Sequence, residues 1–345
     1  MTEVVSPAPP GANAPCNPPR RERLDGLDAM RGIAAMCVLA FHASIPNPEF
    51  TYGGMGYLAV DFFFMLSGYV MARTYEHRFA EGYSARRFML ARYRRLWPVM
   101  AVSTLIGAPM LALELNDPAY FAAAALANLM LIPAIGGTIM FPANSAAWSI
   151  LAELCANLTH RRVLWRLPVR SLLVFAAAML ILVVWTCLVW GTIGVGASWA
   201  AALSGIVRAL LAYGIGIVLW RWWRDEPGIC INPHAAFFAM PLAMLLGQLA
   251  GASWLFEVGF VLLLCPLLIA GGLAYRGSHW LAGWAGMISF PLYAINTPLM
   301  HWAKGLGAGV IPVTVLSILL ASYLAIRMGP VPAAKRPDDN RAIAA

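Results

Sequence analysis

The chain has 345 residues, of which 61% are hydrophobic and only 12% are charged. A soluble domain carries about twice that charged fraction, so the composition excludes an ordinary water-soluble fold and indicates a protein solvated by the lipid bilayer. The net charge of +8 comes from short basic blocks between apolar runs. Such blocks set membrane topology, so we expect no nucleic-acid partner.

Apolar segments that are candidates for membrane helices follow one another along the whole chain. Their approximate bounds are 29–46, 56–75, 97–115, 119–136, 146–159, 171–190, 199–220, 234–250, 253–273, 284–304 and 310–328. We find no internal repeat of the kind seen in inverted-repeat transporters. The pattern predicts an all-α fold, a polytopic membrane bundle of helices.

The arginines show which helix ends face the cytoplasm. Cytoplasmic loops are expected at the N-terminal arginines, at 73–95 with seven arginines and at 161–170 with four. The second and third of these loops are both cytoplasmic, so the chain must cross the membrane an even number of times between them. Three segments lie there: 97–115, 119–136 and 146–159. We expect 119–136, which carries Asn128 and ends near a proline, to stay at the outer face. About ten transmembrane helices remain, with both termini cytoplasmic.

Both ends of the chain have a composition that is typical of disorder. We expect 1–22 and 329–345 to be disordered cytoplasmic tails that flank a membrane domain at 23–328. Met1–Pro19 lacks the apolar core of a cleavable signal peptide, and the bacterial inner (cytoplasmic) membrane is the expected location. The six cysteines lack the spacing of a metal site, so we expect no metal.

Ionisable residues inside membrane helices are costly and usually functional. Arg31 and His42 lie in the first segment, and their spacing places both on one helix face, about 16 Å apart along the axis. Asp61 begins the second segment at a matching depth, and we expect its carboxylate to hold the His42 imidazole. The alternative for Arg31 is a topology anchor, and for His42 an interfacial histidine. For Asp61 it is a carboxylate favoured at the start of a helix.

The loop before the third crossing has more arginine than topology requires. Its five arginines are Arg86, Arg87, Arg92, Arg94 and Arg95. The planar guanidinium suits phosphate, and coenzyme A carries a pyrophosphate and a ribose phosphate. We expect the cluster to bind the nucleotide end of coenzyme A; the alternative is topology combined with binding of anionic lipid.

Later crossings also contain ionisable groups. Glu153 lies in the fourth crossing, about a turn and a half beyond Trp148, and is either a catalytic group or a buried partner for an arginine or histidine. Arg208 in the sixth crossing is expected to pair with an acid inside the bundle. His301, near the outer end of the ninth crossing, is expected to be interfacial.

Four ordered motifs within residues 24–157 resemble those of acyltransferase family 3, the bacterial integral-membrane acyltransferases. The motifs are LDAMRGIAAMCVLAFHA, GYLAVDFFFMLSGYVMA, RYRRLWP and AAWSILAE. The first is similar to the family's arginine–ten residues–histidine motif, and the last to its Trp–Ser–three residues–Glu element. The residues that match are Arg31, His42, Asp61, Phe63, Ser67, Gly68, Arg92, Arg95, Trp148, Ser149 and Glu153.

The resemblance implies a ten-helix domain that moves an acyl group, acetyl being the expected one, from cytoplasmic acyl-coenzyme A to a hydroxyl of a carbohydrate or lipid-linked glycan. It supports catalytic roles for His42, Asp61 and Glu153, and donor binding by Arg31 and the arginine cluster. No permanently bound cofactor is expected. One departure is Asn296 in FPLYAINTP, where many members carry histidine, so we expect no catalytic role at that position.

In the expected mechanism the pantetheine arm runs along the first helix, and His42, held by Asp61, acts as general base on the acceptor hydroxyl or carries the acyl group itself. Two other classes stay open. One is a transporter or flippase of an anionic lipid-linked sugar, without acyl chemistry, and the other is a noncatalytic subunit of a polysaccharide complex. A homo-oligomer also stays open.

Overall fold

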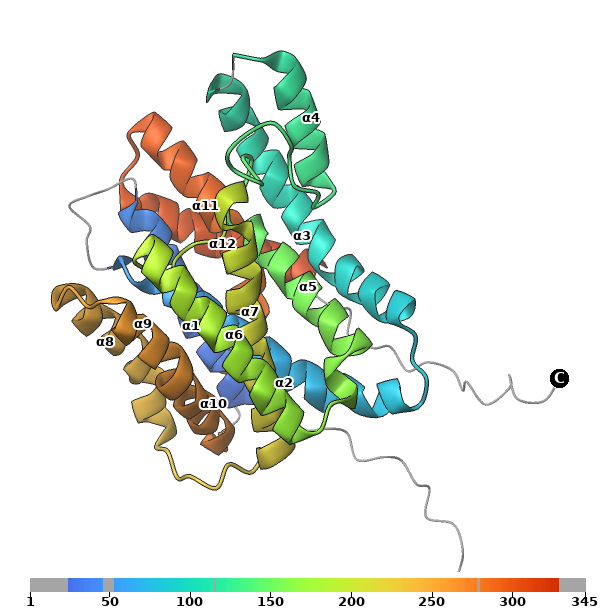
Figure 1. Ribbon diagram of the computed structural model, residues 1–345. Coiled ribbons are helices and arrows are strands. Elements are labelled where there is room, and N and C mark those ends of the chain that lie inside the picture. Colours follow the sequence, from blue (N-terminus) through green and yellow to red (C-terminus); the bar gives the residue numbers. More distant parts are fainter. Residues whose placement is uncertain (1–23, 46–52, 115, 278–279, 329–345) are drawn as a thin grey trace, which may run out of the picture.

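A computed structural model describes residues 24–45, 53–114, 116–277 and 280–328 (Figure 1). Within these ranges the chain is helical, and its single β-type contact is an isolated bridge between Ile139 and Ser198. The all-α class is therefore confirmed. The predicted tails at 1–22 and 329–345 lie outside the described residues.

Every predicted apolar segment contains a helix. The helices are α1 (Asp25–Ser44), α2 (Ala59–Ala80), α3 (Ala85–Glu114), α4 (Pro118–Leu129), α5 (Ala147–Arg162), α6 (Val169–Trp190), α7 (Ala202–Trp223), α8 (Pro233–Leu249), α9 (Trp254–Gly259), α10 (Cys265–Ala274), α11 (Trp280–Leu306) and α12 (Val310–Met328). A π-helical stretch, η5 (Phe260–Leu264), joins α9 to α10. Short 3₁₀ turns precede α2 (η2, Gly56–Leu58), α6 (η3, Leu164–Arg166) and α7 (η4, Trp199–Ala201).

Six helical stretches in the described part of the chain are long and apolar enough to cross a membrane: Asp25–Ser44, Ala85–Glu114, Val169–Trp190, Trp199–Trp223, Trp254–Ala274 and Val310–Met328. The remaining four of the ten predicted crossings, α2, α5, α8 and α11, are helices that are shorter or less apolar. The chain is thus a multi-pass membrane protein. Its α4 has 12 residues, about 18 Å, which is too short for a hydrocarbon core of about 30 Å. This length agrees with the expectation that 119–136 does not cross.

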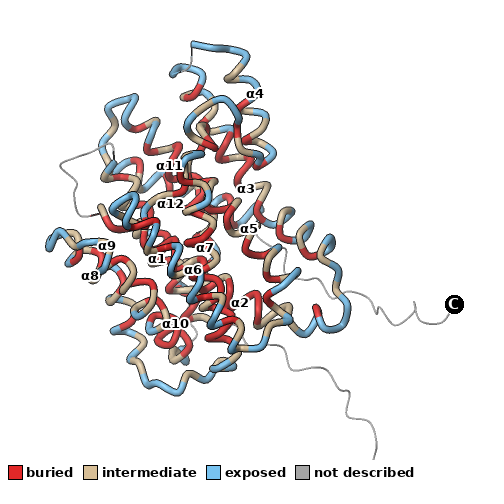
Figure 2. The backbone as a smooth tube through the Cα atoms, in the orientation of Figure 1, coloured by how far each residue is buried: buried red, intermediate tan, exposed pale blue. Residues whose placement is uncertain are grey.

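The centre and the edge of the bundle differ in burial. In the apolar window of the Trp199–Trp223 stretch 67% of the residues are buried, against 28% in α6, and Figure 2 shows buried residues concentrated in the middle of the bundle. Ile181, Trp185 and Leu188 of α6 are each at least 65% exposed. Such an apolar face is stable in lipid and would aggregate in water. Helix α6 therefore faces the bilayer, and α7 lies inside.

A reciprocal pair of glycines brings α2 against α7. A Cβ atom on Gly68 would lie 2.1 Å from the carbonyl oxygen of Tyr213, and one on Gly216 would lie 2.0 Å from that of Met65. Only glycine permits this approach, which is a common basis of helix packing in membranes. Gly68 and Gly216 therefore have a packing role between α2 and α7.

Helix α11 packs along α1 and contains Pro291 and Pro298. A proline inside a helix frees the carbonyl four residues earlier. The carbonyl freed by Pro298 is that of Ala294, which accepts from Ser103 Oγ at 2.5 Å and from Asn144 Nδ2 at 2.9 Å. These bonds hold α11 in place at Ala294, two residues before Asn296.

Candidate functional site

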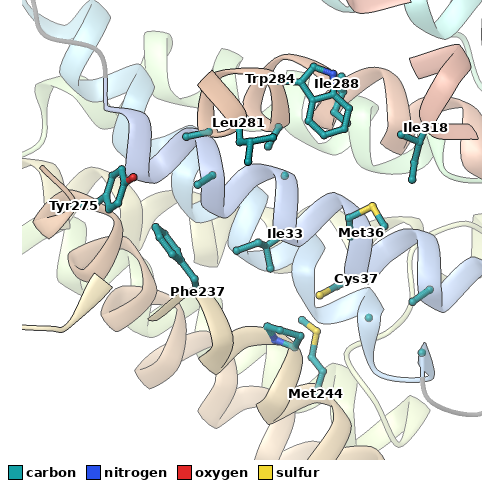
Figure 3. Close-up of a pocket in the computed structure, with 18 residues that line it drawn as sticks. Ile33, Met36, Cys37, Phe237, Met244, Tyr275, Leu281, Trp284, Ile288 and Ile318 are labelled. Carbon is teal, nitrogen blue, oxygen red and sulfur yellow. The ribbon is translucent and has the colours of Figure 1, made fainter. Parts of the chain in front are cut away.

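Two cavities lie on different faces of α1. One, of about 600 Å³, is lined by α1, α8, α11 and α12 and includes Ile33, Met36, Phe237 and Trp284 (Figure 3). No charged side chain lines it within the described residues. A cavity of this mainly apolar composition suits a hydrocarbon chain.

The other cavity, of about 550 Å³, carries the charged groups that the sequence singled out. It lies among α1, α2, α3, α5, α11 and α12, and its volume is ordinary for a ligand site. The charged lining residues are Asp28, Arg31, Arg92, Arg94, Arg95 and Glu153. Four arginines against two carboxylates leave an excess of two positive charges, so this cavity attracts an anion. We call it the arginine cavity.

A buried ion pair forms one wall of the arginine cavity. Arg92 Nη2 donates to Glu153 Oε1 at 2.5 Å, and Ser67 Oγ donates to the same oxygen at 3.0 Å. Arg92 is 6% exposed. The structural alternative for Glu153, a buried partner of an arginine, is therefore correct as a description of its contacts. Its catalytic role stays a prediction.

The other predicted donor-binding arginines divide into two groups. Arg31 lines the cavity and lies 3.4 Å from Asp28 across one helical turn. Arg95 also lines it and is exposed enough to reach a ligand. Arg86 and Arg87 are exposed near the start of α3 and do not line the cavity. The structure thus brings Arg31, Arg92 and Arg95 together and leaves the other two outside.

The end of the arginine cavity away from its arginines is built from hydroxyl and aromatic groups. The hydroxyls of Ser149 and Tyr293 are 2.5 Å apart, and both lie near the carbonyl oxygen of Ala146. The Phe63 ring meets the Tyr293 ring edge-on, with 6.1 Å between centroids. Tyr293 is the last residue of α11 that lines the cavity in the direction of Asn296.

His42 lies about one helical turn beyond this end. Its Nδ1 is 2.5 Å from Asn296 Oδ1 and 3.2 Å from Thr297 Oγ1. Thr297 follows Tyr293 by four residues and therefore shares its face of α11. Because the amide oxygen of Asn296 only accepts, Nδ1 carries the ring proton and Nε2 holds the lone pair. This is the tautomer that a general base requires.

The expected contact between His42 and Asp61 is wrong. Arg208 Nε donates to Asp61 Oδ1 at 2.7 Å, and Arg208 Nη2 donates to Oδ2 at 2.6 Å. Both side chains are buried, and Arg208 also donates to the carbonyl oxygens of Ile193 and Tyr57. The planar guanidinium occupies both carboxylate oxygens because close packing of α2 on α7 places it there. This contact confirms the expected ion-pair role of Arg208.

Sequence reasoning did not predict the contact of Asn296 with His42. Asn296 is fully buried, and its amide oxygen lies 2.5 Å from His42 Nδ1. Tyr293, in the same FPLYAINTP run, also lines the cavity. Two prolines and two polar groups within one apolar helix were the available signal, since such residues in a membrane helix usually mark a functional position.

The sequence model of the acyltransferase domain of acyltransferase family 3 matches residues 24–326. No solved structure matches the chain. The chain is 32% identical over 192 residues to "Protein 2 in picA locus" of Rhizobium radiobacter, which covers 49% of this chain and 96% of that protein.

Two further relatives carry names that describe a transferase. The chain is 28% identical to the "putative membrane-bound transacylase BcsY" of Komagataeibacter xylinus, over 90% of this chain and 84% of that protein. It is also 28% identical over 88 residues to the "peptidoglycan O-acetyltransferase OatA" of Listeria monocytogenes. The latter match covers 25% of this chain and only 13% of OatA.

Proposed function

The chain belongs to acyltransferase family 3, and we propose that this membrane acyltransferase moves an acyl group from acyl-coenzyme A to a hydroxyl of a carbohydrate or lipid-linked glycan. The observation that carries the proposal is the arginine cavity, which has cationic groups at one end and reaches Tyr293, about one helical turn from the contact of His42 with Thr297, at the other. Phosphates at the mouth and a thioester near the histidine are what coenzyme A would supply.

Donor binding follows from the charges at the cavity mouth. Arg92 is engaged by Glu153, whereas Arg94, Arg95 and the partly exposed Arg31, which lies 3.4 Å from Asp28, would contact the phosphates. Arginine forms strong two-point hydrogen bonds with phosphate oxygens. The rise from Arg31 to His42 along α1 is about 16 Å, and the pantetheine arm would extend over this distance past Ser67 and Tyr293.

Chemistry would take place at His42 Nε2. The acceptor hydroxyl gives its proton to Nε2 while its oxygen forms a bond to the thioester carbonyl carbon. The carbon–sulfur bond then breaks, and the leaving thiolate takes the proton from the imidazolium. The products are the acyl ester and free coenzyme A, and His42 returns to its starting tautomer.

A relative and the arginine distribution bear on the acceptor and on the side of the membrane from which the donor binds. The name of OatA describes transfer of an acetyl group to a glycan polymer, which supports acetyl as the acyl group and a carbohydrate as the acceptor. The arginine distribution supports a cytoplasmic donor in the bacterial inner membrane. Cys230, an exposed cysteine between α7 and α8, tests this orientation. A membrane-impermeant maleimide should label it only after the inner face is opened.

Transfer by the purified protein tests the proposal. The protein in lipid discs is given acetyl-coenzyme A with soluble and lipid-linked glycans, and free thiol and acetylated glycan are measured. Thiol release that depends on an acceptor supports the enzyme. If the protein binds acetyl-coenzyme A but releases no thiol with any of the acceptors, the acyltransferase proposal is refuted and the transporter alternative is favoured.

His42→Ala tests the assigned base. Loss of a general base lowers turnover by about a hundredfold to ten-thousandfold, and donor binding should not change because His42 lies beyond the cavity. His234→Ala is the matched control, since this exposed histidine lies at the start of α8. A His42→Ala protein that keeps more than about a tenth of wild-type turnover rules out His42 as the base.

A further inference from the structure

In the side-chain amide of Asn296 the oxygen has hydrogen-bond partners and the nitrogen has none among the described residues. Its oxygen lies 2.5 Å from His42 Nδ1 and accepts from Thr297 Oγ1 at 3.2 Å. Its nitrogen is buried and has no hydrogen-bond partner among the described residues. The whole residue is 0% exposed, so bulk water does not compensate this donor.

The oxygen of the amide points toward His42 and Thr297. It lies 2.5 Å from His42 Nδ1 and accepts from the Thr297 hydroxyl, and an amide oxygen only accepts hydrogen bonds. The two N–H bonds of Nδ2 consequently project away from this cluster.

Leaving a buried donor unpaired is costly, and such groups in native proteins call for an explanation. An N–H donor is satisfied by an accepting oxygen, and most strongly by one that carries negative charge. The acyl carbonyl oxygen gains that charge when the acceptor oxygen bonds to its carbon, and loses it when the carbon–sulfur bond breaks. A donor placed beside the base would stabilise this charge.

We propose that Asn296 binds the acyl carbonyl oxygen through its amide nitrogen while its amide oxygen holds His42 in the tautomer that acts as base. The inference rests on the proposed function and adds a catalytic residue to it. One neutral side chain then orients the base and stabilises the oxyanion. Because both atoms belong to one planar amide, the distance between base and oxyanion site is fixed.

Two substitutions separate the roles of the two amide atoms. Asn296→Ala removes both atoms. Asn296→Asp keeps an oxygen for Nδ1–H, has nearly the same shape and replaces the N–H donor by an oxygen. If orientation were the whole role, Asn296→Asp would retain activity. If the nitrogen binds the carbonyl oxygen, Asn296→Asp fails because it presents negative charge to a developing negative charge.

Turnover and donor binding are measured on the same disc samples, each normalised to folded protein. Removing one oxyanion donor lowers kcat by about 10²–10³, so we expect this loss in both variants, with the dissociation constant for acetyl-coenzyme A within about twofold of wild type. Nitrogen-15 spectra of His42 should still show the proton on Nδ1 in Asn296→Asp.

Asn128→Ala is the matched control. Asn128 is also a buried amide, but its nitrogen donates to the carbonyl oxygens of Ile132 and Met140 and its oxygen accepts from the Ala143 amide. Its loss should lower stability without changing kcat per folded molecule.

The outcomes separate this inference from the proposed function. A wild-type protein without transfer refutes both. Transfer by wild type together with near-wild-type kcat in Asn296→Asp refutes the oxyanion role alone. A loss in Asn296→Ala that appears only as weaker donor binding refutes it as well.

Discussion

The ion pair between Arg92 and Glu153 allows a sharp prediction, because it is largely buried and forms one wall of the arginine cavity. The two side chains meet at 2.5 Å and are only 7% and 18% exposed. Exposed pairs contribute about 0–1 kcal/mol, whereas removing one partner of a buried pair costs about 3–5 kcal/mol. The measured exposure places this pair in the second class.

Replacing Glu153 by leucine leaves the Arg92 charge buried and unpaired, and Arg92→Leu does the same to Glu153. We expect each single variant to lose about 3–5 kcal/mol of unfolding free energy. The double variant should regain most of this loss, since two apolar side chains of similar volume remove both desolvation costs. Ser67 loses its acceptor in both variants that lack Glu153, so recovery should be incomplete by about 1 kcal/mol.

Unfolding free energies can be measured by titrating denaturing detergent into mixed micelles and following helix content. Glu226→Leu, an exposed acid after α7, is the control and should stay within about 0.5 kcal/mol of wild type. A Glu153→Leu protein that loses less than about 1 kcal/mol, or a double variant no more stable than either single variant, refutes the buried-pair argument.

The same three proteins decide whether the carboxylate takes part in chemistry. If Glu153 acts only as the partner of Arg92, the double variant should recover turnover along with stability. If Glu153 carries a proton or contacts the acceptor, the double variant should fold and stay inactive. Donor affinity should change little in either case, because the exposed arginines at the mouth remain.

Three other predictions follow from single contacts. Arg95→Ala should raise the apparent KM for acetyl-coenzyme A at least tenfold, the loss of a charge-assisted phosphate contact worth about 1.5–3 kcal/mol, whereas Arg170→Ala outside the cavity should leave KM unchanged in the same assay. Gly68→Ala should lower the melting temperature strongly, because its Cβ would lie 2.1 Å from a backbone oxygen of α7; Gly228→Ala, with no atom within 4 Å, should be neutral. Asp61→Asn should cost about 3–5 kcal/mol by leaving a buried arginine unpaired, and a stable but inactive Asp61→Asn protein would contradict that structural role.

The helical segments were predictable because a bilayer restricts what each segment can do. A spanning chain must satisfy its own backbone hydrogen bonds, so long apolar runs become helices. The same logic identified α4 as a segment that does not cross, from the count of arginine loops on either side. Arg31, Arg92 and Glu153 also met in one cavity, since charges inside a bundle need one another.

The partners of individual side chains were harder to predict. Position along a helix gives the depth of a residue, and His42 and Asp61 were matched on depth alone. Depth says nothing about rotation around the helix axis, and the rotation of α2 is set by its contact with α7 at Gly68 and Gly216. That contact turns Asp61 toward Arg208. No periodicity in the sequence encodes which neighbouring helix a given face meets.

His42 contacts Asn296 and not Asp61, and this difference has a chemical consequence. A carboxylate beside His42 would stabilise the imidazolium and hold a charge in the path of the acyl group, whereas an amide orients the ring and stays neutral. Asp61 is instead neutralised by Arg208, which also donates to the backbone carbonyl oxygens of Ile193 and Tyr57. The bundle therefore separates its charges into a structural ion pair on α2 and α7 and a binding cavity at the arginine end. His42, the proposed base, has a neutral partner in Asn296. If it acts as the base, the field at the reacting carbonyl is set by neutral donor groups of α11 and not by a carboxylate.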